Sequence, residues 1–333
     1  MSEIAVLGAG SWGTTVAKVI ADGGTELTLW ARNPETVDEI NSSHSNQRYL
    51  PGIELPKGIT ATSDLSQALA GCRQLYLAVP SQQLRKSLES WRGLIPSDVI
   101  VISLMKGLEV QSGKRMSEVI TESLGIPEAQ VAVLSGPNLA LEIARGEPAA
   151  AVCACVSAEH ASEVAKVCSS DYFTVFANQD VIGTELGGVL KNLIAVAIGI
   201  VNGLGYGQNT KASIITRGLS EITTFAIAHG ARRRTMFGLA GLGDLIATSE
   251  STLSRNFQAG ELLGEGKTRD QVLAQLSQTA EGLSSVVPVL EIANRLGIEM
   301  PIVNQVNDVL EGRMKPSEFG KQLNLADDVE MEF

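Results

Sequence analysis

Residues 3–14, EIAVLGAGSWGT, decide the fold, because an apolar run passes directly into a glycine-rich turn and then into a helical pattern. The turn, Gly8-Ala9-Gly10-Ser11-Trp12-Gly13, has the spacing GxGxxG. Between a strand and a helix, the first glycine permits the tight turn, the second lets backbone approach a pyrophosphate, and the third lets helix pack close to strand. The helix N-terminus attracts the negative charge. We expect a bound dinucleotide here, in preference to a purely structural glycine turn.

Short apolar runs alternate with helical patterns over the rest of the first half. The runs predict strands at residues 3–8, 26–31, 75–79, 98–103, 131–135, 149–157 and 172–177. Helices are predicted at residues 12–22, 34–43, 81–92, 114–124 and 158–169. Nearly continuous apolar strands separated by helices are typical of βαβ units in a mostly parallel sheet with both faces covered. The sequence predicts an α/β fold with a doubly wound N-terminal sheet.

From Asn178 onward the pattern changes to long helical periods with no convincing strand. We expect a dinucleotide-binding domain over residues 1–183, an all-helical substrate and catalytic domain over 184–324, and a disordered acidic tail over 325–333. Residues 186–204 are apolar enough to raise a transmembrane interpretation. Because Lys191, Asn192 and four glycines interrupt this run, a helix buried in a domain core is favoured.

Composition and charge limit the partners. Of the 333 residues 44% are hydrophobic and 19% are charged, as in an ordinary globular protein large enough for two cores. Lys+Arg 26 against Asp+Glu 37 gives a formal net charge of -11, and the resulting field repels nucleic acid and anionic membranes. We expect no nucleic-acid partner and no membrane span, while a few focused cations still permit an anionic small molecule.

The N-terminus enters the first strand without a secretory pattern, and the four cysteines contain no CxxC pair, which favours a reducing, cytoplasmic location. Of the three histidines, His160 lies in a polar stretch and His229 in a helical pattern, where surface or packing roles are expected. A histidine catalyst or a zinc site is therefore disfavoured.

The end of the second predicted strand bears on the choice of cofactor. It reads Trp30-Ala31-Arg32-Asn33, without the acidic residue that holds the ribose 2'-hydroxyl in a strict NAD enzyme. An arginine there can bind the 2'-phosphate of NADP. We expect NADP(H) to be preferred, with NAD(H) as the alternative; the other interpretation of Arg32 is a solvated loop charge.

Lys191 lies in VLKNLIAVAIGIV, a helical pattern whose other positions are nearly all apolar. Burial of an ammonium is costly and depresses the pKa of a lysine, which suits it to general base catalysis. The alternative is a lysine whose head group reaches the surface from one end of the helix.

Further polar residues lie in loops. Lys106 follows the strand at 98–103, at the sheet edge where doubly wound folds bind ligands. Ser135-Gly136-Pro137-Asn138 follows the next strand, and Asp244 stands in a glycine loop ahead of Thr248. Ser254-Arg255-Asn256 offers a hydroxyl, a guanidinium and an amide near a helix start, which suits a phosphate. Each of these segments is also an ordinary turn or helix cap.

Together these segments resemble one family, the NAD(P)-dependent glycerol-3-phosphate dehydrogenases of the bacterial type. The resemblance rests on eight segments in order: GAGSWGT at 8–14, MKGLE at 105–109, SGPN at 135–138, LGGVLKN at 186–192, TRGLSEI at 216–222, GLAGLGDL at 238–245, SRN at 254–256 and EG at 281–282. It implies a Rossmann-like N-terminal domain, an all-α C-terminal domain and a homodimer. The implied reaction is the reversible reduction of dihydroxyacetone phosphate to sn-glycerol 3-phosphate, which feeds glycerophospholipid synthesis.

The resemblance also implies roles for single residues. The catalytic set is Lys191, Lys106, Asn192 and Asp244, with Lys191 as proton acceptor and donor. Substrate is bound by Lys106, Gly136, Asn138, Lys191, Asp244, Ser254, Arg255 and Asn256. The cofactor contacts Gly8, Gly10, Ser11, Trp12, Gly13, Arg32, Lys106, Ala140, Arg255 and Glu281. Asn138 departs from the family pattern, since Ser or Thr is usual at this position.

Two alternatives remain open at this stage. A β-hydroxyacid dehydrogenase also joins such a sheet to helices with a catalytic lysine, but it recognises a carboxylate. A nucleotide-sensing protein without turnover is disfavoured, because a sensor has no need of a general base.

Overall fold

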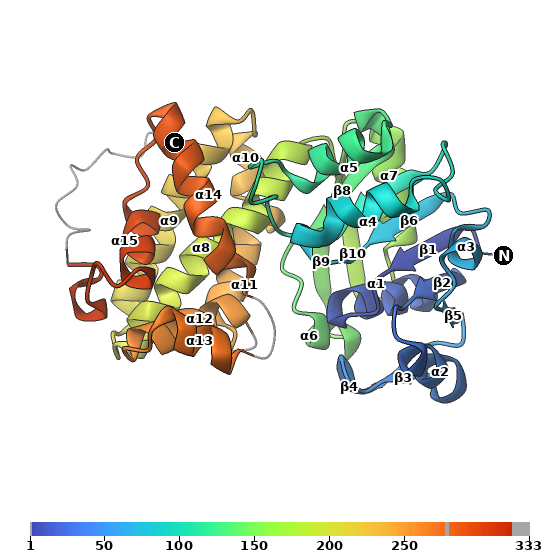
Figure 1. Ribbon diagram of the computed structural model, residues 1–333, viewed down its shortest axis with the longest axis horizontal. Coiled ribbons are helices and arrows are strands. Elements are labelled where there is room, and N and C mark those ends of the chain that lie inside the picture. The colour runs from blue at the N-terminus through green and yellow to red at the C-terminus, as the bar shows by residue number, and fades with distance from the viewer. Residues whose placement is uncertain (1, 253, 277–279, 322–333) are drawn as a thin grey trace. The chain divides into compact units, whose positions relative to one another are not determined.

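The computed structural model describes residues 2–252, 254–276 and 280–321 (Figure 1). The chain divides into a first unit of Met1–Gly188 and His229–Asp244 and a second unit of Val189–Ala228 and Leu245–Phe333. The first unit thus extends beyond the predicted boundary at residues 183/184 and includes a later segment. That segment is held by hydrogen bonds such as Arg232 N–H to Asp180 Oδ2, at 2.8 Å. The predicted acidic tail lies outside the described residues.

The first unit contains an 8-stranded sheet in the order β10-β9-β8-β7-β6-β1-β2-β5. All neighbouring strands are parallel except β8 and β9, and β3 and β4 form a separate antiparallel pair. From β5 to β8 the order is that of a doubly wound dinucleotide-binding sheet, which confirms the predicted fold class. The strands are β1 Ile4–Leu7, β2 Leu27–Trp30, β3 Ser45–Asn46, β4 Leu50–Glu54, β5 Ile59–Thr62, β6 Gln74–Leu77, β7 Ile100–Ser103, β8 Val131–Ser135, β9 Ala149–Cys155 and β10 Phe173–Asn178.

Helices cover both faces of this sheet and produce two apolar cores (Figure 1). Residues of α1, α6 and α7 pack on one face, and residues of α3, α4 and α5 pack on the other. The helices of this unit are α1 Ser11–Asp22, α2 Pro34–Ser43, α3 Leu65–Leu69, α4 Leu84–Trp91, α5 Met116–Leu124, α6 Ala140–Ala144, α7 Ala158–Val167 and α10 Arg233–Met236; η1 Ser81–Gln83 and η2 Glu128–Gln130 are 3₁₀ turns, and η3 Leu239–Gly243 is a π-helix.

The described part of the second unit contains helices and no strand. It includes most of α8 Val181–Gly203, together with α9 Gln208–Ala228, α11 Asp244–Glu250 beyond its first residue, α12 Arg255–Gly264, α13 Arg269–Gln275, α14 Glu281–Leu296, α15 Pro301–Leu310 and the 3₁₀ turn η4 Pro316–Glu318. By length and composition α8 alone among the described helices could span a membrane, but 89% of its most apolar window is buried within the protein. This burial agrees with the predicted core helix.

Glycines bring α8 and α12 into backbone contact. A Cβ at Gly199 would lie 2.2 Å from the carbonyl oxygen of Phe257, and one at Gly260 would lie 2.0 Å from that of Val196. The same holds between Gly264 and Ile200, at 2.2 Å. The contacts Val196–Gly260 and Ile200–Gly264 advance by four residues on both helices, as do Gly199–Phe257 and Gly203–Glu261, so α8 and α12 run in the same direction at close range.

A buried carboxylate joins α9 to α15. Glu221 accepts hydrogen bonds from Ile302 N–H at 2.9 Å and Val303 N–H at 3.0 Å, at the start of α15. Burial raises the pKa of Glu221 to about 7, although the two N–H donors act to lower it.

This pKa predicts a pH-dependent stability. The pKa of Glu221 is about 7 in the folded chain, against the usual value of 4.5. Between about pH 4.5 and pH 7 the folded chain therefore binds more protons than the unfolded chain, and the free energy of unfolding falls as the pH rises through this range. In Glu221→Gln this contribution should vanish. Urea unfolding of both proteins should show the stability advantage of the wild type over Glu221→Gln shrinking by up to about 3 kcal/mol from about pH 5 to about pH 8. A difference independent of pH would contradict the raised pKa.

Candidate functional site

Two glycines of the turn after β1 are required by the fold. Gly8 has a φ of +122°, and a Cβ there would lie 2.3 Å from the carbonyl oxygen of Ala78 beyond β6. A Cβ at Gly13 would lie 2.0 Å from the carbonyl oxygen of Gly8. Gly10 differs, because a Cβ there would meet nothing within 4 Å. The protein therefore leaves open space at Gly10, where a ligand could approach the protein backbone closely.

The start of α1 fits the pyrophosphate of a dinucleotide. The helix begins at Ser11, its N-cap is Gly10, and no side chain caps it. An uncapped helix N-terminus offers N–H donors and a favourable dipole to an anion. The indole Nε1 of Trp12 is buried and has no hydrogen-bond partner among the described residues. Ala140 lies close by, since its carbonyl oxygen accepts a hydrogen bond from Thr15 Oγ1 of α1 at 3.2 Å.

Arg32 lies just beyond β2 with an exposed side chain. No salt bridge to it occurs in the part of the chain that the structure describes. Its guanidinium is therefore available to an anion at the end of the second strand.

Lys106 and Asp244 form an ion pair within the first unit. Lys106 Nζ donates to Asp244 Oδ2 at 2.7 Å and to the carbonyl oxygen of Gly136 at 2.8 Å. The Asp244 side chain is 2% exposed and that of Lys106 is 17% exposed. This arrangement brings three predicted site residues together at the carboxyl ends of β7 and β8.

Glycine packing positions this ion pair. A Cβ at Gly188 on α8 would lie 2.7 Å from Ser135 Oγ and 3.2 Å from Lys106 Cγ. A Cβ at Gly187 would lie 2.4 Å from the carbonyl oxygen of Ala240 in the π-helix that precedes Asp244. The start of α8 can therefore lie directly against both partners.

The loop after β8 presents polar atoms without partners. Both amide atoms of Asn138 and the hydroxyl of Ser135 are buried and form no hydrogen bond with the described residues. Between them Gly136 has a φ of +147°, and a Cβ there would lie 3.0 Å from Ala151 Cα. Buried polar groups are normally satisfied, so unpaired atoms beside Lys106 are consistent with a polar ligand.

In the second unit Lys191 is buried, with 6% of its surface exposed. Its Nζ donates a hydrogen bond to Thr248 Oγ1 on α11. The head group thus meets a hydroxyl inside the protein and does not extend to the surface. Asn192, the next residue on α8, is 5% exposed.

The three residues Ser254-Arg255-Asn256 open α12. Ser254 is the N-cap, and its Oγ accepts from Phe257 N–H at 3.3 Å, which is the structural role also considered from the sequence. Asn256 Oδ1 accepts from Gly282 N–H at 3.0 Å, and a Cβ at Gly282 would lie 3.0 Å from the carbonyl oxygen of Asn192. The starts of α12 and α14 therefore meet beside Asn192.

Arg255 faces the start of α14. Burial acts to lower the pKa of Arg255, and the nearby carboxylate of Glu281 acts to raise it. Under both influences the guanidinium of Arg255 stays protonated at neutral pH.

The predicted site residues are divided between the two units. The first unit holds Gly8, Gly10, Ser11, Trp12, Gly13, Arg32, Lys106, Gly136, Asn138, Ala140 and Asp244, and the second holds Lys191, Asn192, Ser254, Arg255, Asn256 and Glu281. Sequence reasoning missed Asn46, whose contacts with the glycine turn are described below. No sequence signal marks it, because a lone asparagine in a turn-rich stretch is unremarkable.

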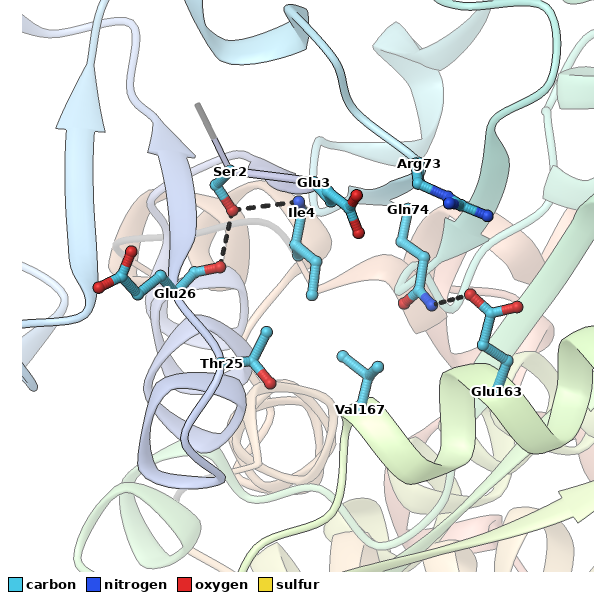
Figure 2. A pocket seen from close by; sticks show the side chains of 9 residues that line it. All are labelled: Ser2, Glu3, Ile4, Thr25, Glu26, Arg73, Gln74, Glu163 and Val167. Atoms are coloured by element: carbon cyan, nitrogen blue, oxygen red, sulfur yellow. Dashed lines mark hydrogen bonds between the residues drawn. The ribbon is translucent and has the colours of Figure 1, made fainter.

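A separate hollow of about 360 Å³ lies at the amino-terminal edge of the sheet, where β1 and β6 begin (Figure 2). Its walls include Glu3, Glu26 and Glu163, and Gln74 Nε2 donates to Glu163 Oε1 at 2.8 Å. None of the predicted site residues lines it. In a doubly wound sheet ligands bind at the opposite, carboxyl edge.

A doubly wound sheet with a glycine turn at an uncapped helix, joined to a helical unit with a buried lysine, is the architecture of a two-domain dinucleotide-dependent dehydrogenase. Residues 3–173 match the N-terminal model of the NAD-dependent glycerol-3-phosphate dehydrogenases, and residues 180–321 match the C-terminal model. The chain belongs to this family, as the sequence segments indicated.

Individual relatives agree with this assignment. The chain is 55% identical to the NAD(P)+ glycerol-3-phosphate dehydrogenase of Leifsonia xyli subsp. xyli, over 97% of this chain and 88% of that protein. It is 50% identical to the same enzyme of Thermobifida fusca, over 96% and 95%. The crystal structure of glycerol-3-phosphate dehydrogenase from Coxiella burnetii superimposes with a TM-score of 0.90 at 36% identity, covering 97% of this chain and 98% of that one.

Proposed function

We propose that this protein catalyses the NAD(P)H-dependent, reversible reduction of dihydroxyacetone phosphate to sn-glycerol 3-phosphate. The family match over almost the whole chain carries this proposal. The cofactor supplies the hydride when bound, so the protein must orient the substrate and handle one proton. The glycine turn, Trp12 and Ala140 would hold the cofactor, and the exposed Arg32 would favour NADP(H) over NAD(H).

The proton is assigned to Lys191. Its Nζ lies in a buried setting beside a hydroxyl, so it can hold a proton without exchanging it freely with bulk water. In the reducing direction Nζ donates to the carbonyl oxygen of the substrate, and in the oxidising direction it accepts from the hydroxyl. Asn192 is proposed to help orient this lysine.

The remaining polar residues are assigned to binding and orientation. Lys106, held by Asp244, would polarise the carbonyl, and Gly136 and Asn138 would contact the substrate. Ser254, Arg255 and Asn256 would bind the phosphate, with Arg255 also near the cofactor together with Glu281. Binding energy from the phosphate can then position the reacting carbon.

The oligomeric state, the cellular location and the metabolic role of the enzyme are also proposed. We infer a homodimer in the cytoplasm whose product feeds glycerophospholipid synthesis, because these are the properties that the family resemblance implies. Equilibrium sedimentation of the purified chain tests the dimer directly.

The activity is tested by following NADPH and NADH oxidation with dihydroxyacetone phosphate. Faster turnover with NADPH supports both the reaction and the role of Arg32, whereas comparable rates keep the reaction and remove the preference. Turnover only with 3-oxo carboxylates would instead identify a β-hydroxyacid dehydrogenase. Nucleotide binding without any turnover would identify a sensor.

Gly10→Ala is predicted to separate cofactor binding from folding. Gly10 has a φ of −76° and free space around its Cα, so alanine fits the protein alone. A methyl group there would obstruct a pyrophosphate, and NADPH affinity should fall by about ten-fold or more. Gly93→Ala is the matched control, because its Cβ also meets nothing within 4 Å. Equal NADPH affinity in Gly10→Ala and Gly93→Ala, measured by titration calorimetry, would refute a pyrophosphate at this turn.

A further inference from the structure

Asn46 on β3 connects a separate hairpin to the glycine turn. Its side chain is fully buried, and its Nδ2 donates to the carbonyl oxygen of Ala9 at 3.0 Å and to Thr14 Oγ1 at 2.9 Å. Ala9 lies inside GxGxxG, and Thr14 lies in the first turn of α1. One amide group therefore holds both sides of the turn.

The orientation of this amide follows from chemistry. A backbone carbonyl only accepts hydrogen bonds, so the atom facing the Ala9 oxygen must be the NH₂ group. Asn46 Oδ1 is then left buried without a partner among the described residues. An unpaired buried acceptor lowers stability. An apolar residue would avoid that loss of stability. What the asparagine provides at this position is therefore the two hydrogen bonds that it donates.

The bond to Ala9 sets the direction of a particular N–H group. The carbonyl of Ala9 and the N–H of Gly10 belong to one planar trans peptide, in which they point in opposite directions. Fixing the carbonyl toward Asn46 therefore points the Gly10 N–H away from the hairpin. Gly10 is also the glycine with open space around it.

The hairpin is anchored independently of the turn. Glu39 Oε1 on α2 accepts from Ser45 Oγ at 3.0 Å and from Gln47 N–H at 2.7 Å, on either side of Asn46. Between β3 and β4, the carbonyl oxygen of Tyr49 accepts a hydrogen bond from Ser11 Oγ of α1 at 2.9 Å. The hairpin is thus a fixed support, and the turn is fastened to it at Ala9, Ser11 and Thr14.

We propose that Asn46 is a positioning residue for the cofactor, which orients the Ala9–Gly10 peptide so that its N–H group faces the pyrophosphate. This inference rests on the proposed function, because it assumes that the turn binds a dinucleotide. Asn46 acts through the backbone and does not touch the cofactor.

The test is NADPH binding and steady-state kinetics of Asn46→Leu, whose side chain has nearly the same shape but has no hydrogen-bond donor for Ala9. We expect the dissociation constant and the KM for NADPH to rise by about ten-fold, with the KM for dihydroxyacetone phosphate and kcat at saturating NADPH unchanged. Asn41→Leu is the control, since among the described residues the Asn41 amide is hydrogen-bonded to the backbone of Ala61 on β5, at 2.9 and 2.8 Å, and not to the glycine turn.

Asn46→Leu changes a fully buried side chain, so Glu39→Ala serves as a second variant that acts from the partly exposed face of α2. It loosens the hairpin without touching the turn, and a smaller rise in the NADPH dissociation constant is expected. Wild-type affinity for NADPH in Glu39→Ala and in folded Asn46→Leu would overturn the inference. A wild-type protein that binds neither NADPH nor NADH would overturn the proposed function itself, which makes the two failures distinguishable.

Discussion

Replacement of Lys191 by alanine is expected to lower turnover by about 10²- to 10⁴-fold, the usual contribution of a general acid–base group. The physical reason is that Lys191 Nζ, held by Thr248 inside the second unit, is the proposed carrier of the substrate proton. Lys191→Met should lose as much activity, because methionine fills a similar volume but carries no exchangeable proton. Both variants should bind NADPH normally, since the glycine turn lies in the first unit.

A matched control comes from the neighbouring helix. Lys211 on α9 donates a hydrogen bond to Asn202 Oδ1, so it is another lysine of the second unit with a neutral partner. Lys211→Met should keep near-wild-type turnover. If Lys191→Met also turned over dihydroxyacetone phosphate at the wild-type rate, the proton would have to come from another group.

Replacement of Arg115 by methionine is expected to destabilise the folded chain by about 3–5 kcal/mol. Arg115 Nη1 donates to Glu185 Oε2 at 2.8 Å, and the Glu185 side chain is only 3% exposed. Ser117 also donates to this carboxylate through its N–H group and its hydroxyl. The variant leaves a buried carboxylate without its counter-charge, which urea unfolding should detect.

The loss should depend on pH in a defined direction. Burial raises the pKa of Glu185, while Arg115 acts to lower it, so removing Arg115 raises the pKa further. The folded variant then holds a proton that the unfolded chain releases, and its stability falls as the pH rises. The difference from wild type should therefore widen from about pH 5 to about pH 8.

An exposed pair provides the comparison. Arg313 and Asp308 form an ion pair with side chains 54% and 39% exposed, and Arg313→Met should cost less than about 1 kcal/mol. Equal losses in Arg115→Met and Arg313→Met would show that burial of the Glu185 pair is unimportant for stability.

The main strands of the sheet could be predicted from the sequence because they are buried on both faces. The predicted strands at 98–103 and 131–135 contain the unbroken apolar runs 99–102 and 131–134, and the structure has β7 and β8 there. The strand β5, ITAT, has no such apolar run, because two of its four residues are threonines. The β3–β4 pair was missed for a similar reason, since β4 contains Pro51 and Gly52.

The ion pairs and buried side-chain hydrogen bonds could not be predicted, because their partners are distant in the sequence. Asn46 and Ala9 are 37 residues apart, and Arg115 and Glu185 are 70 apart. Only the folded chain brings such pairs together. The predicted Lys106, Gly136 and Asp244 were each named from a local motif, but the ion pair that joins two of them was not.

The division of the first unit into two chain segments has a consequence for synthesis on the ribosome. Asp244 follows Lys106 by 138 residues, and the segment that carries it comes after residues of the second unit. At a translation rate of about 5–20 residues per second, roughly 7–28 s pass between the synthesis of Lys106 and that of Asp244. The nascent sheet must therefore persist without its closing ion pair while the first segment of the second unit, Val189–Ala228, is synthesised.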